Sequence, residues 1–194
     1  MSMFCFQCQE AAMGKGCTIQ GVCGKQPDTA KLQDLLVHTT KSIAFFSRKL
    51  RASGNVSSDV DYYLINSLFT TITNANFDND VIIERIREGL KLRDNLWQIT
   101  KEKGITIENT FPTYLKATSE LATTDEMIAF AETVGVLRTE NEDIRSLREL
   151  VIYGLKGLTA YAEHAFNLGK QNPEIYSFIE KALVEVDNPA NGAD

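Results

Sequence analysis

Basic residues are in the minority in this sequence. Its 20 lysines and arginines are outnumbered by 26 aspartates and glutamates, which gives a formal net charge of −6 and a pI of about 5.1. Nucleic-acid binding requires a basic face that displaces counterions from phosphates, and anionic membranes attract polybasic segments. The composition argues against both kinds of partner, so we expect no nucleic acid and no membrane among them.

Long apolar runs are also missing. No stretch approaches the roughly 18 consecutive apolar residues of a membrane span. The opening MSMFCFQCQE lacks the basic region and the apolar region of a secretory signal. We therefore expect a cytoplasmic protein. In that reducing compartment, clustered cysteines more often hold metal or carry out redox chemistry than form structural disulfides.

Cysteine is absent after position 23. All four cysteines lie within FCFQCQEAAMGKGCTIQGVCGK, residues 4–25, with the spacing Cys-x2-Cys-x8-Cys-x5-Cys. The same segment contains four glycines, which permit positive φ angles and a close approach of the backbone to a bound group. We take residues 1–27 as a cysteine-rich binding loop whose candidate ligands are Cys5, Cys8, Cys17 and Cys23.

The spacing alone leaves three interpretations open. Two disulfides would need an oxidising compartment. A structural zinc ion accepts four thiolates, but zinc ribbons usually carry two close cysteine pairs, and here only Cys5 and Cys8 form one. A cubane iron–sulfur cluster spreads its ligands over four irons and tolerates wider gaps, although neither common ferredoxin spacing matches.

The sequence has no alternating pattern that predicts strands. From Asp28 onward, apolar residues recur at helical intervals, as in Leu32, Leu36 and Ile43. We therefore predict an all-α fold built of antiparallel bundles. The predicted helices cover residues 28–54, 59–73, 78–104, 123–135, 139–169 and 172–187, with a long connection at 105–123.

The domain boundaries follow from this pattern. We expect residues 28–187 to form the helical bundle domain, since 43% of the sequence is hydrophobic and can supply a core. The final DNPANGAD lacks apolar anchors, so residues 188–194 are predicted to be a frayed tail.

Capping residues support several helix boundaries. Asp78 and Asn172 are expected N-caps, the latter followed by Pro173 in the first turn. Gly54 suits a left-handed position at a helix C-terminus. Two capping boxes of the type Ser/Thr-x-x-Glu are predicted, Thr123 with Glu126 and Thr139 with Glu142.

Two glycines, Gly154 and Gly157, stand inside the longest predicted helix. Each should cost up to about 1 kcal/mol relative to alanine. We expect a neighbouring helix or the cysteine loop to approach them closely.

No catalytic constellation stands out. His38 and His164 lie within predicted helices, and the glutamates suit capping and solvated helix faces. We expect these residues to be structural and predict no catalytic residue.

Three segments of the sequence carry a resemblance to a known family. They are MFCFQCQEAAMGKGCTIQGVCGK with the later LQDLL, FTTITNANFD at 69–78, and TENEDIRSLRELVIYGLKGLTAYAEHA at 139–165. In order and separation they resemble the first domain of the hybrid-cluster proteins, also called prismane proteins or hydroxylamine reductases. The similarity extends from Met3 to about Leu183.

The resemblance implies a cofactor and a role. In family members with this spacing the four cysteines hold a [4Fe-4S] cluster, and in members with wider gaps a [2Fe-2S] cluster; the matching positions are Cys5, Cys8, Cys17 and Cys23. The family's first domain has two three-helix bundles, of which residues 58–135 would be the inserted second. In complete enzymes, electrons pass through this cluster to a mixed iron–sulfur–oxygen cluster, where hydroxylamine is reduced to ammonia. Nitric oxide reduction has also been proposed for the family.

The sequence also departs from the family pattern. The family's hybrid cluster is bound by further cysteines, glutamates and a histidine in two α/β domains that follow the first, whereas no cysteine follows Cys23 here. The resemblance implies that these 194 residues cannot build the hybrid cluster and only relay electrons. The expected partners are an electron donor protein and the missing C-terminal domains or a companion chain. A structural zinc-binding or metal-free helical docking module is the alternative.

Overall fold

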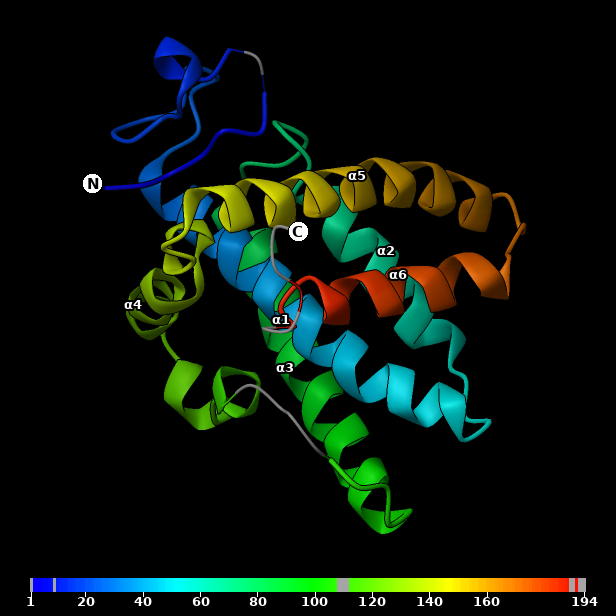
Figure 1. Ribbon diagram of the computed structural model, residues 1–194. Coiled ribbons are helices and arrows are strands. Elements are labelled where there is room, and N and C mark those ends of the chain that lie inside the picture. The colour runs from blue at the N-terminus through cyan, green and yellow to red at the C-terminus, as the bar shows by residue number, and fades with distance from the viewer. Residues whose placement is uncertain (1, 9, 108–111, 189–190, 192–194) are drawn as a thin grey trace.

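The computed structural model describes residues 2–8, 10–107, 112–188 and 191, and helices dominate this part (Figure 1). The described residues contain no strand, only an isolated antiparallel bridge between Cys5 and Cys17. The all-α prediction is confirmed. The α-helices of the described chain are α1 (Pro27–Ala52), α2 (Ser58–Thr70), α3 (Asn79–Glu102), α4 (Thr124–Val134), α5 (Glu142–Asn167) and α6 (Pro173–Glu185).

Most of the predicted helix ends are confirmed. The Asp78 side chain accepts hydrogen bonds from the first backbone amides of α3, and Thr123 and Glu126 form the expected capping box of α4. Asn172 caps α6, with Pro173 at its first position. At the end of α1, Gly54 has a φ of 81°, and its amide donates to the Arg51 carbonyl at 3.0 Å.

The second predicted capping box is wrong. Helix α5 begins at Glu142, and its N-cap is Asn141, whose side-chain oxygen accepts from the Ile144 amide at 3.0 Å. The Thr139 hydroxyl instead accepts from Arg148 at 3.3 Å. Asparagine is at least as good an N-cap as threonine, and its position three residues before Ile144 is the one that the helix uses.

The predicted long connection at 105–123 contains two short 3₁₀ helices, η2 (Pro112–Leu115) and η3 (Thr118–Leu121). Within η2, Tyr114 is fully buried, and its hydroxyl donates to Asp187 Oδ2 at 2.9 Å. Residues 108–111 of this connection lie outside the described part. The connection therefore contributes a buried side chain to the core, which periodicity did not predict.

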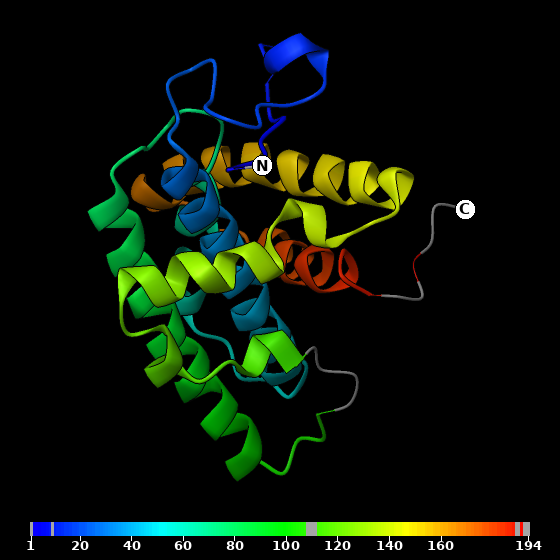
Figure 2. The same ribbon diagram turned by 90° about the vertical axis from the view of Figure 1, so that its left-hand side faces the viewer.

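Helix α1 crosses the middle of the molecule (Figures 1 and 2), and two apolar clusters share it. The first joins the C-terminal half of α1 to α2, α5, α6 and the end of α3, with Phe46, Leu64 and Ile179 among its buried side chains. The second joins the N-terminal half of α1 to α3 and α4, where Leu36 packs with Ile86. Helix α1 is therefore the central element of the molecule.

The two clusters group the helices in a particular way. Helix α2 belongs to the cluster of α5 and α6, whereas the predicted insertion of residues 58–135 groups it with α3 and α4. The division of the chain into 1–27, 28–187 and 188–194 stays a prediction, and most of the tail lies outside the described residues.

Asp187, the first residue of DNPANGAD, is anchored rather than frayed. It is 3% exposed and forms ion pairs with Lys41 Nζ at 3.1 Å and with the Arg138 guanidinium. Burial alone would raise the pKa of Asp187, but Lys41 and Arg138 together lower it well below its usual range. These contacts attach the end of α6 to α1 and to the turn η4 (Val136–Arg138).

The expectation for Gly154 and Gly157 is wrong. A Cβ atom built on either glycine would meet no atom within 4 Å, because both face open space on α5. Neither a neighbouring helix nor the cysteine loop approaches them. Their outer face continues into exposed apolar side chains of the same helix, Leu147, Leu150, Val151 and Tyr153.

Within the described residues, no helix combines the length and the apolar character that crossing a bilayer requires.

Candidate functional site

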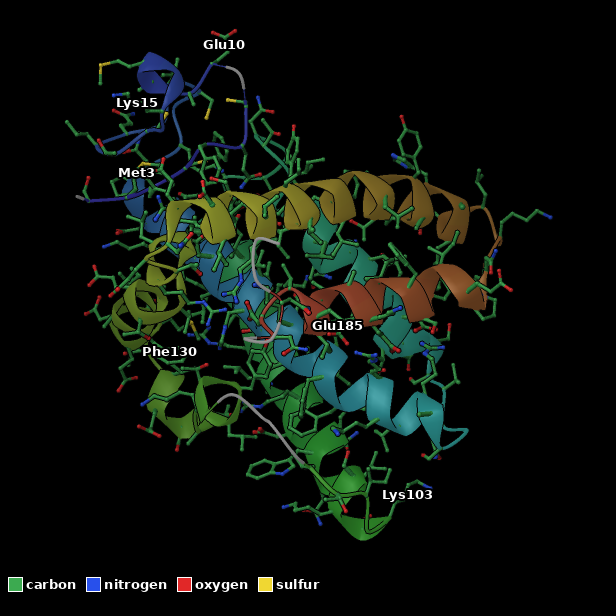
Figure 3. All side chains as sticks on the ribbon, in the orientation of Figure 1. Met3, Glu10, Lys15, Lys103, Phe130 and Glu185 are labelled. Atoms are coloured by element: carbon green, nitrogen blue, oxygen red, sulfur yellow. The ribbon has the colours of Figure 1, made fainter. Side chains whose placement is uncertain are left out.

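The cysteine loop, residues 2–26, lies over the N-terminal ends of α1 and α5 (Figure 1). Its two limbs pair at Cys5 and Cys17, where the Cys5 amide donates to the Cys17 carbonyl at 3.1 Å and the Cys17 amide donates back at 2.8 Å. Met3, Cys17 and Ala30 form a small buried cluster that attaches the loop to α1. Figure 3 shows Glu10 and Lys15 on the outer side of the loop, away from the helices, whereas Met3 lies at its base.

All four cysteines are free thiols. Cys17 is 5% exposed, Cys5 and Cys8 are half-buried, and Cys23 is exposed. The backbone bridge brings Cys5 and Cys17 together. Across the described residues, no three cysteine, histidine, aspartate or glutamate side chains are arranged as a ready-made site for a metal ion.

Glycines leave room for the thiols and for the rings beside them. A Cβ atom on Gly21 would lie 3.1 Å from Cys23 Sγ, and one on Gly16 would lie 2.8 Å from the Phe4 ring. The Gly21 amide donates to the Lys25 carbonyl, and the Gly24 amide donates to the Gly21 carbonyl, each at 2.8 Å. The chain around Cys23 is therefore a tight turn in which a side chain at position 21 would crowd the sulfur.

Lys25 is the buried cation of the loop. It is 1% exposed, and its Nζ lies 3.9 Å from Cys5 Sγ and 5.6 Å from the centre of the Phe77 ring. Among the residues that the structure describes, no carboxylate forms an ion pair with it. A lysine is almost never fully buried unless it is paired, so the burial of Lys25 favours an anionic group bound next to its Nζ.

Segments far apart in the sequence form the wall of the site. The Thr73 amide donates to Gln7 Oε1 at 3.1 Å, which ties the α2–α3 connection to the loop. Lys156 of α5 donates to the Thr71 carbonyl of that same connection at 3.3 Å. The three segments that carry the family resemblance therefore meet at one place.

Charged groups lie beneath the loop, of which Lys156 is buried and Asp34 and Glu149 are half-buried. Asp34 and Glu149 line a small cavity together with Cys5 and Lys25. Burial raises the pKa of Asp34, and Glu149 adds to this shift. Burial also lowers the pKa of Lys156. Both shifts favour the neutral forms, as expected where water is excluded.

An open apolar groove lies beside the loop. It has a volume of about 280 Å³ and is lined by Phe6 and Gln7 of the loop and by Leu150 and Tyr153 of α5, among other residues. The groove continues along the exposed face of α5. It offers an apolar surface next to the thiols rather than a closed substrate pocket.

The two histidines lie in helices, away from the cysteine loop. His38 is 4% exposed in the core, and its Nε2 donates to the Thr113 carbonyl at 3.3 Å. His164 lies in the last turn of α5, with its ring edge against Phe69. Neither lies among the residues around the thiols.

Sequence reasoning missed Lys25, Asp34 and Gln7. Spacing identifies cysteines because metal centres require thiolates at set intervals, but it does not reveal whether a lysine in a loop is buried. The only available signal was that few charged residues occur between Met1 and Lys25.

The fold and the site together define a class: an all-α domain with a four-thiol loop lying over the ends of its helices. The model of the Prismane/CO dehydrogenase family matches residues 3–192, and the chain belongs to this family. The family resemblance carried by the three sequence segments is confirmed. Members of the family bind iron–sulfur clusters.

Similar proteins carry the name hydroxylamine reductase. One from Bacteroides thetaiotaomicron is 52% identical over 186 residues, which is 96% of this chain and 33% of that protein. Another from Desulfitobacterium hafniense strain DCB-2 is 51% identical and covers 100% of this chain and 35% of that protein. The chain therefore spans about a third of the length of the relatives that it matches.

The residues of the loop fit an iron–sulfur cluster. Four free thiols are available, Gly21 leaves space at Cys23 Sγ, and the buried Lys25 Nζ lies 3.9 Å from Cys5 Sγ. Thiolates are the usual ligands of these clusters, and the negative charge of a thiolate-bound cluster complements the lysine side chain.

Proposed function

We propose that this chain is the electron-relay domain of a hydroxylamine-reductase-type enzyme and that it binds one [4Fe-4S] cluster. Cys5, Cys8, Cys17 and Cys23 are the proposed ligands. The observation that carries the proposal is the combination of four free thiols with the buried Lys25 at Cys5 Sγ. Bound there, the cluster supplies one-electron transfer.

The chain's own residues would hold and shield the cofactor. Phe4 and Phe6, whose ring centres lie 5.2 Å apart, limit access of water to one side of the loop. The Cys5–Cys17 bridge fixes the backbone between two ligands. No residue is proposed to act on a substrate. The thiols must stay reduced, which suits a cytoplasmic location.

The first test is an anaerobic absorption spectrum with iron and acid-labile sulfide counts on freshly purified protein. We expect about four irons and four sulfides per chain and a brown chromophore that bleaches with dithionite. Cys17→Ser should abolish the chromophore, while the exposed Thr124→Ser should leave it unchanged.

Other results would contradict the proposal. Stoichiometric zinc in a colourless protein would support the structural zinc site instead. A protein that stays metal-free after anaerobic reconstitution would support a helical docking module. Full iron content in Cys17→Ser would remove that residue from the ligand set.

The hydroxylamine reaction is proposed only for the longer protein. The relatives named hydroxylamine reductase are about three times as long as this chain, so the isolated 194 residues should show no turnover of hydroxylamine with a chemical reductant. Sustained ammonia production by the purified chain would contradict this expectation.

The remaining two-thirds of the relatives' length is the partner that we propose for the open face of α5. Leu147, Leu150, Val151 and Tyr153 are 46%, 66%, 44% and 42% exposed there, beside the groove next to the thiols. Contiguous exposed apolar residues of this kind mark an interface. An electron donor protein would then approach from another side of the cysteine loop.

A complementation experiment tests this contact. The part of the Desulfitobacterium hafniense relative that lies outside the matched region is expressed separately and mixed with the purified chain. We expect Leu150→Lys to weaken the complex at least tenfold, whereas Val81→Lys, on a 45% exposed residue of α3, should not. Equal effects of the two variants would contradict the proposed surface.

A further inference from the structure

Lys25 is an anomaly in the charge distribution of the molecule. Its side chain is 1% exposed, and its polar contact is with a sulfur atom, Cys5 Sγ at 3.9 Å. The other buried cations of the described residues donate to oxygen atoms: Lys41 to Asp187, Arg93 to the Tyr114 carbonyl and Lys156 to the Thr71 carbonyl. Of these four, Lys25 is the one whose polar contact is a proposed cluster ligand.

Nearby carboxylates attract Lys25 only at longer range. Asp34 and Glu149 line the same cavity, and Asp34 interacts electrostatically with Lys25, but neither forms a close ion pair with it in the described part of the chain. Lys156, on the α5 side, adds positive charge to the same region and directs its Nζ at Thr71. An ammonium buried without a close ion pair is costly, and an anionic group bound by the thiolates would supply that partner.

We propose that Lys25 is a positioning residue for the thiolate-bound cluster: its ammonium holds the Cys5 sulfur and favours the reduced state of the centre. This inference rests on the proposed function. An electron supplied by a reductant adds one negative charge to the centre, and the fixed positive charge at Cys5 Sγ stabilises that charge.

Because Lys25 is packed away from water, its effect on the reduction of the centre should be large. Lys25 is excluded from water by the α2–α3 connection, where Phe77 covers it. Charges that are screened little by solvent interact more strongly than exposed ones. Lys15 is the matched comparison, because it lies in the same loop but is exposed to solvent.

The test is an anaerobic redox titration of the reconstituted chain with dithionite, followed by its absorption. Lys25→Met should lower the equilibrium constant for reduction at least tenfold, which is about 59 mV for a one-electron couple. Lys15→Met should change it much less, and Lys25→Arg should restore most of the wild-type value. Iron and sulfide counts on each variant verify that the cofactor is the same.

Three results would overturn the inference. Lys25→Met could titrate like the wild type, Lys15→Met could shift the potential equally, or Lys25→Arg could behave like Lys25→Met. The last result would point to packing rather than charge. Each of these leaves the iron content, and therefore the proposed function, intact.

Discussion

His38 is an imidazole enclosed by aromatic rings in the core. Its ring centre lies 5.2 Å from that of Tyr114 and 5.9 Å from that of Phe130. Burial lowers the pKa of His38 to about 3, whereas an imidazole in the unfolded chain takes up a proton below about pH 6.5. The unfolded state therefore binds more protons between these values, and the free energy of unfolding falls as the pH falls through this window.

Replacement of His38 tests this pH dependence. His38→Gln keeps an amide that can donate to the Thr113 carbonyl but has no titrating group. We expect its free energy of unfolding to fall less than that of the wild type between pH 6.5 and pH 3, measured by urea denaturation. His164→Gln, at an exposed side chain, is the control and should follow the wild type. Parallel curves for His38→Gln and wild type would contradict the buried neutral imidazole.

Among single residues, the sequence indicates those whose chemistry depends on their spacing along the chain. The cysteines attract attention because four thiols lie in one glycine-rich segment, and their role as ligands stays a prediction. Lys25 and Asp187 were not found. Their roles depend on burial and on partners that are more than a dozen residues away, such as Lys41 for Asp187, and local pattern contains no information on either.

Gly154 and Gly157 lower the stability of α5, although no neighbouring atom requires a glycine at either position. A Cβ atom on Gly154 meets no atom within 4 Å, so Gly154→Ala should raise the stability of the chain by about 0.5 to 1 kcal/mol. Gly89 in α3 is the contrasting case, because a Cβ there would lie 2.8 Å from Thr39 Cγ2 and collide with the Tyr63 hydroxyl. Gly89→Ala should destabilise. Chemical denaturation monitored by circular dichroism measures both, and a loss of stability in Gly154→Ala would contradict the open face.

Three helices are joined by one buried ion network. Arg51 of α1 donates from Nε to Glu180 of α6 at 2.7 Å and also pairs with Asp61 of α2. Arg51→Met would leave two buried carboxyl groups without their cation, so we expect a loss of about 3 to 5 kcal/mol at neutral pH. Burial raises the pKa of Asp61 to about 6, so the loss should shrink as the pH falls below this value and Asp61 takes up a proton.

An exposed pair provides the control for this network. Arg48 and Glu185 are 38% and 36% exposed, so Arg48→Met should change the free energy of unfolding by less than about 1 kcal/mol. A similar loss of unfolding free energy in both variants, at every pH, would show that the aliphatic parts of the arginine side chains contribute through packing and not through charge.

Helix boundaries were predictable where a capping side chain acts locally. Asp78, Thr123 and Asn172 each bond to amides within the next three residues, which a sequence displays directly. The start of α5 was misjudged because both Thr139 and Asn141 are acceptable caps. The packing of α2 against α5 could not be read from periodicity, which identifies the buried face of a helix but not the element that covers it.

The molecule as a whole depends on α1, which belongs to both apolar clusters. We therefore expect one cooperative unfolding transition. Ile86→Ala, in the second cluster, should lower the free energy of unfolding by about 2 to 5 kcal/mol. The fluorescence of Trp97, which packs against the first cluster, should shift together with the circular dichroism signal. Separate midpoints for the two signals would show that the clusters unfold independently.

The walls of the cysteine loop come from Thr73 and from Lys156, far beyond the thiols themselves. A ribosome adds roughly 5–20 residues per second, so the thiols emerge on the order of ten seconds before Lys156 is joined to the chain. During that interval the thiols lie in a nascent segment that lacks its packing partners, and they are exposed to water, oxygen and free metal ions. A cofactor can therefore enter the complete site only after α5 has been synthesised.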